Sequence, residues 1–197
     1  MSDPVELLDF WLGEIGPEGW YAGGDEIDST CRARFIDLWQ AARDGGLDHW
    51  IDGTVGTLAF IILTDQLPRN MFRGTADSFA TDAHALTAAR AALAKGWDMG
   101  APEPERQFFY MPFEHSENAE DQALALRLME ERLPSDPEMA LHARAHQAVI
   151  ARFGRFPGRN AALGRATTAA EQDWLDQGGY GAEVRRLQAS GSHAPDA

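Results

Sequence analysis

Three short segments of this 197-residue chain hold most of the side chains that could do chemistry. The first runs from Thr64 to Arg73, and its Asp65 closes the most apolar stretch of the chain. Burying a carboxylate is costly unless a cation pairs with it, so Arg69 or Arg73 is the expected partner. The segment also carries the amide of Asn70. Its polar side chains form either a structural ion pair or one wall of a binding site.

The second segment, 108–117, places Glu114, His115 and Glu117 directly after a run of aromatic residues. An imidazole beside carboxylates is a typical general base, so His115 steered by Glu114 or Glu117 could move a proton. The alternative is local and structural. Ser116 would then begin a helix as its N-cap, and Glu117 would be an acid favoured in the first helical turn.

The third segment, 153–160, carries Arg155, Arg159 and Asn160 on a Gly/Pro turn between aromatic residues. A turn of this kind can hold guanidinium groups around an anion, or it can simply cap two helices. Arginine is the suitable residue for the first role, because its planar fork binds a carboxylate or phosphate with two hydrogen bonds.

The charge of the chain bears on its partners. With 17 basic and 31 acidic residues the net charge is −14, which makes nucleic acid and anionic membrane surfaces poor partners. No acid lies between Glu138 and Glu171, an interval that contains five arginines. These arginines either dock against the acidic part of the same chain or form an internal site for an anionic small molecule.

Other templates for chemistry are absent from the sequence. There is no dinucleotide-binding Gly-x-Gly-x-x-Gly, Walker loop, His-Glu-x-x-His or Gly-x-Ser-x-Gly. His142 and His146 are one helical turn apart, but with no carboxylate nearby in the sequence we interpret them as partly buried polar residues. The single Cys31 excludes a disulfide framework. We expect no metal site and no cofactor.

Start and stop signals predict the helices that position these segments. Asp3 and Pro4 open a first short helix, a loop covers 13–24, and Pro68 ends the central apolar helix. The remaining helices are predicted at 26–44, 55–66, 82–95, 105–111, from 116 or 118 to 133, at 137–153, and from a capping box at 168–171.

No stretch alternates like a half-buried strand, so the sequence predicts an all-α fold of eight or nine helices in antiparallel pairs, packed as a superhelix or a bundle. We expect one domain over 1–189 and a flexible tail at 190–197. The start lacks a signal peptide, and the longest apolar run, 58–63, is far short of the about 20 residues that span a bilayer. These features predict a cytoplasmic protein.

Taken together, four motifs resemble those of the bacterial domain-of-unknown-function family 924, over nearly the whole chain. The motifs are Asp65-Gln-Leu-Pro-Arg-Asn-Met-Phe-Arg-Gly74, Phe79-Ala-Thr-Asp82, Tyr110-Met-Pro-Phe-Glu-His-Ser-Glu117 with Asp121-Gln122, and Phe153-Gly-Arg-Phe-Pro-Gly-Arg-Asn160 with Leu163-Gly-Arg165. The resemblance implies a tetratricopeptide-like all-α fold and no particular function. Leu67 and Gly158 stand where the family pattern usually has Phe and His.

Two functions remain open on this sequence. In the first, the chain is a small-molecule binding protein or an enzyme of hydrolase or transferase class. Its acid-base groups would be Asp65, Glu114, His115 and Glu117, and its ligand-binding groups Arg69, Asn70, Arg73, Arg155, Arg159 and Asn160. This function requires the side chains to converge on a cavity of roughly 300 Å³ or more. In the second, the chain is a protein–protein interaction module for a peptide or a basic partner.

Overall fold

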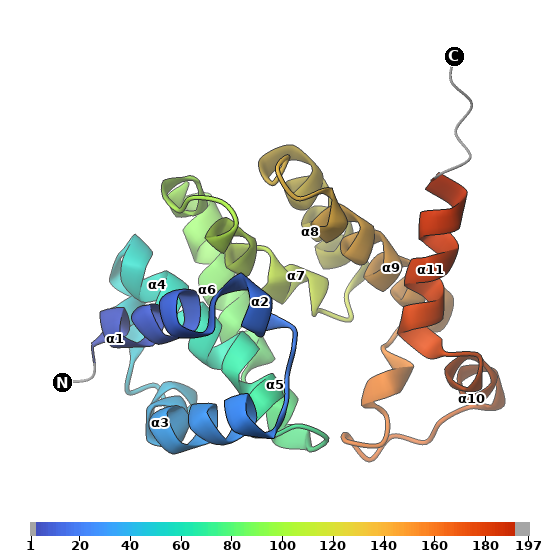
Figure 1. The fold of residues 1–197 in the computed structure, drawn as a ribbon, viewed down its shortest axis with the longest axis horizontal. Coiled ribbons are helices and arrows are strands. Elements are labelled where there is room, and N and C mark those ends of the chain that lie inside the picture. Colours follow the sequence, from blue (N-terminus) through green and yellow to red (C-terminus); the bar gives the residue numbers. More distant parts are fainter. Residues whose placement is uncertain (1–2, 192–197) are drawn as a thin grey trace. The chain divides into compact units, whose positions relative to one another are not determined.

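The computed structural model describes residues 3–191, which contain helices and turns and no β-strand (Figure 1). The predicted all-α fold is confirmed for this part of the chain. None of its helices combines the length and the apolar character that a bilayer crossing needs.

The contacts between Cα atoms divide the chain into two compact units, residues 1–112 and 113–197, which we call unit 1 and unit 2 and describe separately. The single domain over 1–189 stays a prediction. Of the predicted tail, residues 192–197 lie outside the described residues.

Unit 1 is a set of short and medium helices linked by π and 3-10 turns. Its α-helices are α1 (Pro4–Leu8), α2 (Gly16–Trp20), α3 (Asp25–Arg43), α4 (Thr54–Ile61), α5 (Leu67–Met71) and α6 (Asp82–Ala94). Its π segments are Asp9–Ile15 and Ile62–Gln66, and its 3-10 segments are Asp48–Asp52, Ala76–Phe79, Trp97–Gly100 and Glu105–Phe109. The chain passes from unit 1 to unit 2 within α7 (Met111–Glu114).

The central apolar helix does not end where the sequence predicts. After α4 the chain widens into a π turn at Ile62–Gln66 and continues directly into α5, with Pro68 in the first turn of α5. Proline lacks an N–H and clashes with the carbonyl four residues earlier, and a wider turn removes that conflict. The N–H of Leu67 accordingly bonds to the carbonyl of Ile62, five residues back. The prediction that Pro68 ends the helix is therefore wrong.

The predicted loop at 13–24 is also wrong over most of its length. Asp3 caps α1 as expected, but the chain then stays helical through the π segment Asp9–Ile15 and α2. The indole of Trp20 donates a hydrogen bond to the carbonyl of Trp11 at 2.7 Å, which ties the two segments together. The glycines of this segment favour a loop by local propensity, but the packing of the buried tryptophans stabilises the helical conformation.

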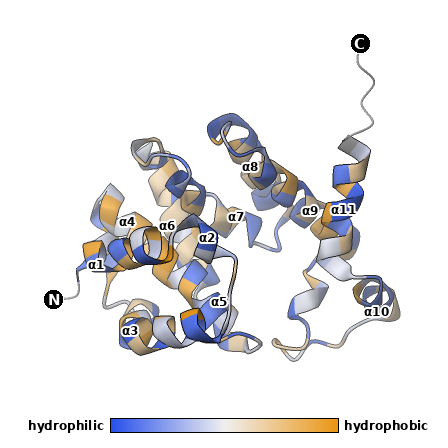
Figure 2. Ribbon diagram, viewed as in Figure 1, coloured by the Kyte–Doolittle hydropathy of each residue, from blue (hydrophilic) through white to orange (hydrophobic). Residues whose placement is uncertain are grey.

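Aromatic side chains form much of the core of unit 1. The ring of Trp20 meets Phe108 at 4.8 Å between centroids, and Phe10 meets Phe35 at 5.0 Å. The hydrophobic residues of α4, orange in Figure 2, are buried from Thr57 to Ile61. This burial explains why α4 lacks the charged face of a surface helix.

Unit 2 contains α8 (Ala119–Arg132), α9 (Pro137–Phe153), α10 (Ala169–Asp176) and α11 (Gly179–Gly191). A short turn joins α8 and α9 into an antiparallel pair, and α11 packs against α9 (Figure 1). A buried apolar cluster of Val149, Ile150, Phe156 and Trp174 anchors α9, the following loop and α10.

The helix ends of unit 2 follow the sequence closely. Asn118 caps α8 by accepting hydrogen bonds from two backbone N–H groups of its first turn, which settles the choice between residues 116 and 118. Gly154 ends α9 in the left-handed conformation, and Thr168 with Glu171 forms the predicted capping box of α10. These capping signals depend on residues within one turn of each other, so tertiary packing does not change where the helices begin and end.

Gly56 tests the packing of α4. A Cβ at this position would lie 2.2 Å from the carbonyl oxygen of Trp50, a backbone atom that cannot move aside, whereas a Cβ at Gly13 would meet nothing within 4 Å. We expect Gly56→Ala to lower the free energy of unfolding by about 1–3 kcal/mol. Gly13→Ala should change it little or raise it by up to about 1 kcal/mol. Urea unfolding of both variants checks this, and equal effects would contradict the close approach.

Candidate functional site

The first segment forms a charged cluster inside unit 1. Asp65 lies fully buried in the π turn, and its carboxylate is 3.5 Å from the guanidinium of Arg69. The same guanidinium donates to both carboxylate oxygens of Asp82, at 3.0 and 3.2 Å. The buried charge of Asp65 is thus compensated by Arg69, one of the two partners that the sequence allowed.

Arg73, the other allowed partner, binds a different carboxylate. Its guanidinium donates to the two oxygens of Asp28 at 2.8 and 2.9 Å, and the amide of Asn70 donates to Asp28 at 2.9 Å. The hydrogen bond from Arg73 lowers the pKa of Asp28 against the opposing effect of burial. These contacts tie α3 to the end of α5, and the partner 45 residues earlier in the chain could not be read from local spacing.

The second and third segments meet within unit 2. The carboxylate of Glu117 accepts two hydrogen bonds from Arg165, at 2.8 and 3.0 Å, and a third from the backbone N–H of Phe156 at 2.8 Å. Arg159 donates to the carbonyl of His115 at 2.9 Å. Burial raises the pKa of Glu117, but its hydrogen bonds from Arg165 and Phe156 outweigh that effect and lower the pKa.

A second carboxylate holds the other end of the same loop. Glu171 accepts two hydrogen bonds from Arg155, at 2.6 and 2.8 Å, and one from the backbone N–H of Thr168 at 2.7 Å. These bonds, above all those from Arg155, lower the pKa of Glu171 far below its ordinary range. The amide of Asn160 lies 3.4 Å from Glu171. The ligand-binding role of Arg155 and Asn160 stays a prediction, and their contacts described here are to the protein itself.

The buried acid-base candidate Glu114 contacts a histidine of another helix. Glu114 is buried in α7, and its carboxylate oxygen lies 2.6 Å from Nδ1 of His146 on α9. Glu117 accepts two hydrogen bonds from Arg165, and the acid-base role of His115 stays a prediction. The ring of His115 lies edge-on to that of His146, with 6.2 Å between centroids. The imidazole that the buried carboxylate orients is therefore His146.

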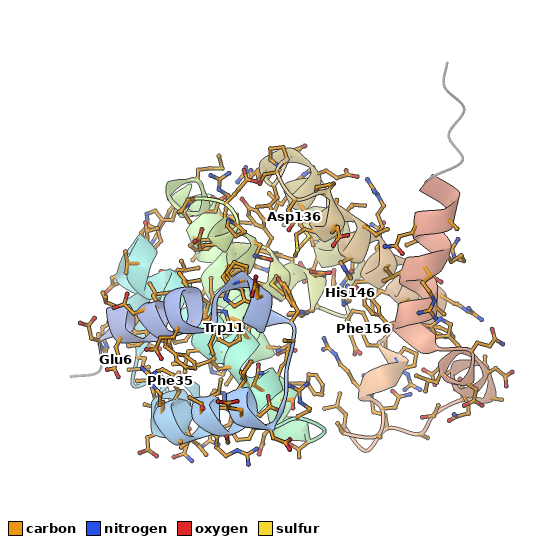
Figure 3. The ribbon with its side chains drawn as sticks, viewed as in Figure 1. Glu6, Trp11, Phe35, Asp136, His146 and Phe156 are labelled. Atoms are coloured by element: carbon orange, nitrogen blue, oxygen red, sulfur yellow. The ribbon has the colours of Figure 1, made fainter. Side chains whose placement is uncertain are left out.

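Tyr180 of α11 completes this cluster. Its hydroxyl oxygen is 2.6 Å from Nδ1 of His142 and 3.3 Å from Nδ1 of His146, and its ring lies 4.6 Å from that of His146. Phe156, in the loop after α9, packs edge-on against His146 at 5.4 Å (Figure 3). Burial, aided by the negative charge of Glu114, raises the pKa of Tyr180, so its hydroxyl keeps its proton.

The electrostatics of the cluster keep Glu114 ionised. Burial alone would raise its pKa, but attraction to His146, the hydrogen bond from that ring, and the nearby His115 and His142 together lower it. Nδ1 of His146 faces the Glu114 carboxylate and, at 3.0 Å, the carbonyl of His142. Both are acceptors only, so Nδ1 carries the hydrogen.

The opposite ring nitrogen is then the basic one. In the neutral ring, Nε2 of His146 holds the lone pair, and no hydrogen bond from residues 3–191 reaches it. The His146 side chain is 20% exposed. A carboxylate that fixes the tautomer of an imidazole and stabilises its protonated form is the arrangement of a general base.

Sequence reasoning named Glu114 but missed His142, His146 and Tyr180 as its neighbours. The four-residue spacing of the two histidines was a correct sign of one helix face. The carboxylate that gives the face its chemistry lies 32 positions before His146, and only folding brings the two together. Within the described part of the chain, no group of three or more His, Cys, Asp or Glu side chains is arranged to hold a metal ion.

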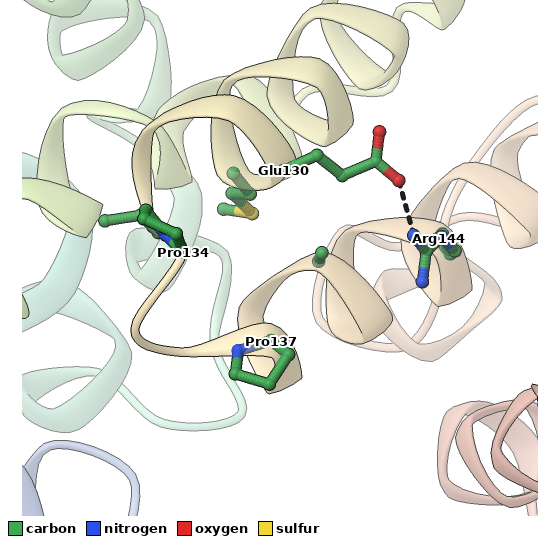
Figure 4. A pocket seen from close by; sticks show the side chains of 7 residues that line it. Glu130, Pro134, Pro137 and Arg144 are labelled. Carbon is green, nitrogen blue, oxygen red and sulfur yellow. Dashed lines mark hydrogen bonds and ion pairs between the residues drawn. The ribbon is translucent and has the colours of Figure 1, made fainter.

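Three hollows of the described residues lie away from this cluster. One of about 240 Å³ lies at the turn between α8 and α9, beside the ion pair of Glu130 and Arg144 (Figure 4). One of about 460 Å³ is lined by α8, α9 and α11, and one of about 440 Å³ by residues of unit 1 that include His84. None of the predicted site residues lines these three hollows.

The helical fold and the joint occurrence of the four motifs define a class of bacterial proteins without an assigned function. Residues 7–179 match the family described as "Bacterial protein of unknown function (DUF924)", and the chain belongs to that family. It is similar to the solved structure of the protein of unknown function ATU0120 from Agrobacterium tumefaciens. The identity is 38% and the TM-score 0.83, over 88% of this chain and 97% of that one. A comparison with curated proteins finds no match.

Glu117 gives a pH-dependent test of the loop contacts. Because its pKa is lower in the folded state, the stabilisation is fully present above the unfolded pKa of about 4.3 and is lost as the pH falls through the lower folded value. We expect Glu117→Gln to cost about 1–2 kcal/mol near neutral pH, since charge-assisted hydrogen bonds are lost. The difference from the wild type should shrink below about pH 4.

Urea unfolding at several pH values measures this difference. Glu131→Gln, an exposed acid on the same unit, is the matched control and should show a small effect at every pH. A cost for Glu117→Gln that stays constant from neutral to acid pH would contradict a carboxylate held by Arg165.

Proposed function

We propose that the chain is an enzyme of hydrolase or transferase class in which the Glu114–His146 pair removes a proton from a nucleophile. The observation that carries the proposal is the 2.6 Å contact between the buried carboxylate and Nδ1 of His146. This contact leaves Nε2 of the same ring as the basic nitrogen. Residues 3–191 offer it no hydrogen bond, so it is available to a substrate.

Burial strengthens the pair. Glu114 is 2% exposed, so its interaction with the imidazole is weakly screened by water. When His146 takes up a proton, the adjacent negative charge stabilises the imidazolium without any rearrangement of solvent. The carboxylate therefore holds the orientation of the ring and fixes its tautomer.

A positive group lies near this base. The guanidinium of Arg159 lies 4.6 Å from the centre of the Phe156 ring, and His146 packs on the same ring. Arg159 also contacts the carbonyl of His115. This placement favours a small anionic substrate, a carboxylate or a phosphate ester, which Arg159 would hold beside His146.

The remaining predicted site residues have other parts in the proposal. Arg155 holds Glu171 and thereby the loop that presents Phe156 and Arg159. Asp65, Arg69, Asn70 and Arg73 are left out of the catalytic proposal, because their contacts link α3, α5 and α6 inside unit 1.

Hydrolysis of p-nitrophenyl acetate, a simple ester probe, tests the base. We expect His146→Gln and Glu114→Gln each to lower the rate about tenfold or more, as the loss of general-base catalysis does. His49→Gln, at an exposed histidine of unit 1, is the matched control and should keep the wild-type rate. Thermal unfolding of all variants shows whether they fold.

Two outcomes would contradict the proposal. One is a rate for His146→Gln equal to that of His49→Gln, which would favour the protein–protein interaction module instead. The other comes from the unaltered protein. Diethyl pyrocarbonate modifies accessible imidazole nitrogens, so mass spectrometry of the treated wild type should find His146 modified, and an unmodified His146 would mean that its Nε2 cannot be reached.

A further inference from the structure

His142 and His146 lie on one face of α9 and have different kinds of partner at the same ring nitrogen. Nδ1 of His146 faces a carboxylate, whereas Nδ1 of His142 faces the hydroxyl of Tyr180. We infer that the two rings hold opposite tautomers, so that His146 offers a lone pair at Nε2 and His142 offers an N–H at Nε2. The inference rests on the proposed function and adds a proton donor to it.

The partners of each group determine where the hydrogens on the ring nitrogens and the hydroxyl of this cluster lie. The hydrogen on Nδ1 of His146 is required by Glu114 and by the carbonyl of His142, which can only accept. Tyr180 therefore cannot donate to this nitrogen, although its oxygen lies 3.3 Å away. The hydroxyl can only accept a share of the His146 N–H.

The hydroxyl hydrogen of Tyr180 then has one partner left. Nδ1 of His142 is 2.6 Å from the hydroxyl oxygen, the distance of a strong hydrogen bond. Because Nδ1 accepts this bond, it carries the lone pair, and the neutral ring of His142 must hold its hydrogen on Nε2. The stacked rings of His142 and Tyr180, with 5.9 Å between centroids, keep the two groups in register.

The neighbouring charges agree with this order. Glu114 on α7 is the acidic group whose charge acts on both histidines and on Tyr180. A phenol near a buried carboxylate keeps its proton and acts as a donor. No hydrogen bond from the described residues reaches Nε2 of His142, and its side chain is partly exposed. Two ring nitrogens one helical turn apart thus offer an acceptor and a donor.

This pair fits reactions in which one group loses a proton and another gains one. The substrate class is a small ester or phosphate ester with a poor leaving group, and the co-reactant is water or a second hydroxyl compound. His146 Nε2 takes the proton of the attacking hydroxyl as its oxygen bonds to the carbonyl carbon or phosphorus. His142 Nε2–H gives its proton to the leaving oxygen as the old bond breaks.

Tyr180 balances the protons between the two rings. As His142 loses its Nε2 hydrogen, its Nδ1 receives the hydroxyl hydrogen of Tyr180. His146 keeps its Nδ1 hydrogen on Glu114, and water carries the proton gained at its Nε2 to the phenol oxygen. Each ring and the phenol end neutral, and exchange of the ring hydrogens with water restores the starting tautomers. Tyr180 contacts neither the nucleophile nor the leaving group, so it acts through His142, whose tautomer it fixes and whose proton it replaces.

Nuclear magnetic resonance of ¹⁵N-histidine-labelled protein tests the inference, because couplings between ring nitrogens and ring hydrogens show which nitrogen is protonated. At about pH 8, where an ordinary histidine is neutral, we expect hydrogen on Nδ1 of His146 and on Nε2 of His142. His142→Gln and His146→Gln assign the signals. The measurement on the wild type stands even if a variant fails to fold.

Tyr180→Phe adds a readout that a merely structural role would not move. It should abolish the tautomer preference of His142 and leave that of His146 intact, since Glu114 is still present. Tyr21→Phe, which removes a hydroxyl from unit 1, is the matched control and should change neither ring.

Each remaining outcome is decisive. Hydrogen on Nδ1 of His142, or a His142 tautomer that Tyr180→Phe does not alter, overturns this inference while the general base survives. Hydrogen on Nε2 of neutral His146 overturns the proposed function together with it.

Discussion

The cluster of histidines and Tyr180 in unit 2 is organised around one buried negative charge, that of Glu114. Glu114 is almost fully buried. A buried carboxylate is stable only when its surroundings compensate for the hydration free energy that it loses. His146 supplies part of that compensation through its hydrogen bond to the carboxylate, which lowers the pKa of Glu114. An arginine has donors only, whereas a neutral imidazole donates one hydrogen bond to the carboxylate and keeps a lone pair on the far side of the ring.

Two further carboxylates determine where the surroundings of this pair lie. Glu117 and Glu171 hold Arg165 and Arg155, and between them they fix both ends of the loop that carries Phe156. The loop contains little regular secondary structure. Ion pairs and helix caps hold it in place of the backbone hydrogen bonds that a longer helix would have. Of these three carboxylates, Glu114 is the one paired with an imidazole, whereas Glu117 and Glu171 are paired with arginines.

The parts of the structure that could be predicted from the sequence are those governed by neighbours along the chain. The capping box at Thr168, the Gly154 stop and the helix that opens at Pro137 depend on hydrogen bonds within one turn, and each was predicted correctly. The π turns have no such local signature, so Pro68 was wrongly expected to end a helix. The tetratricopeptide-like arrangement stays a prediction.

The sequence shows only part of the cluster around Glu114, for the same reason. Glu114 could be named because it stands beside a histidine in the sequence, but the histidine that it binds comes from another helix, and Tyr180 from a third. Residue types alone could not show that Glu114 binds His146, a histidine far from it in the sequence. The contact between the carboxylate oxygen of Glu114 and the ring of His146 appears only in the folded structure.

The π turn at Ile62–Gln66 has a consequence for how this chain can vary in length. A π turn holds about one residue more than an α turn, so it behaves as an insertion absorbed without unwinding the helix. Deleting that residue would restore regular winding and rotate everything after it by about 100° around the helix axis. Arg69 would then swing away from Asp82, so a one-residue change in this segment alters direction more than length.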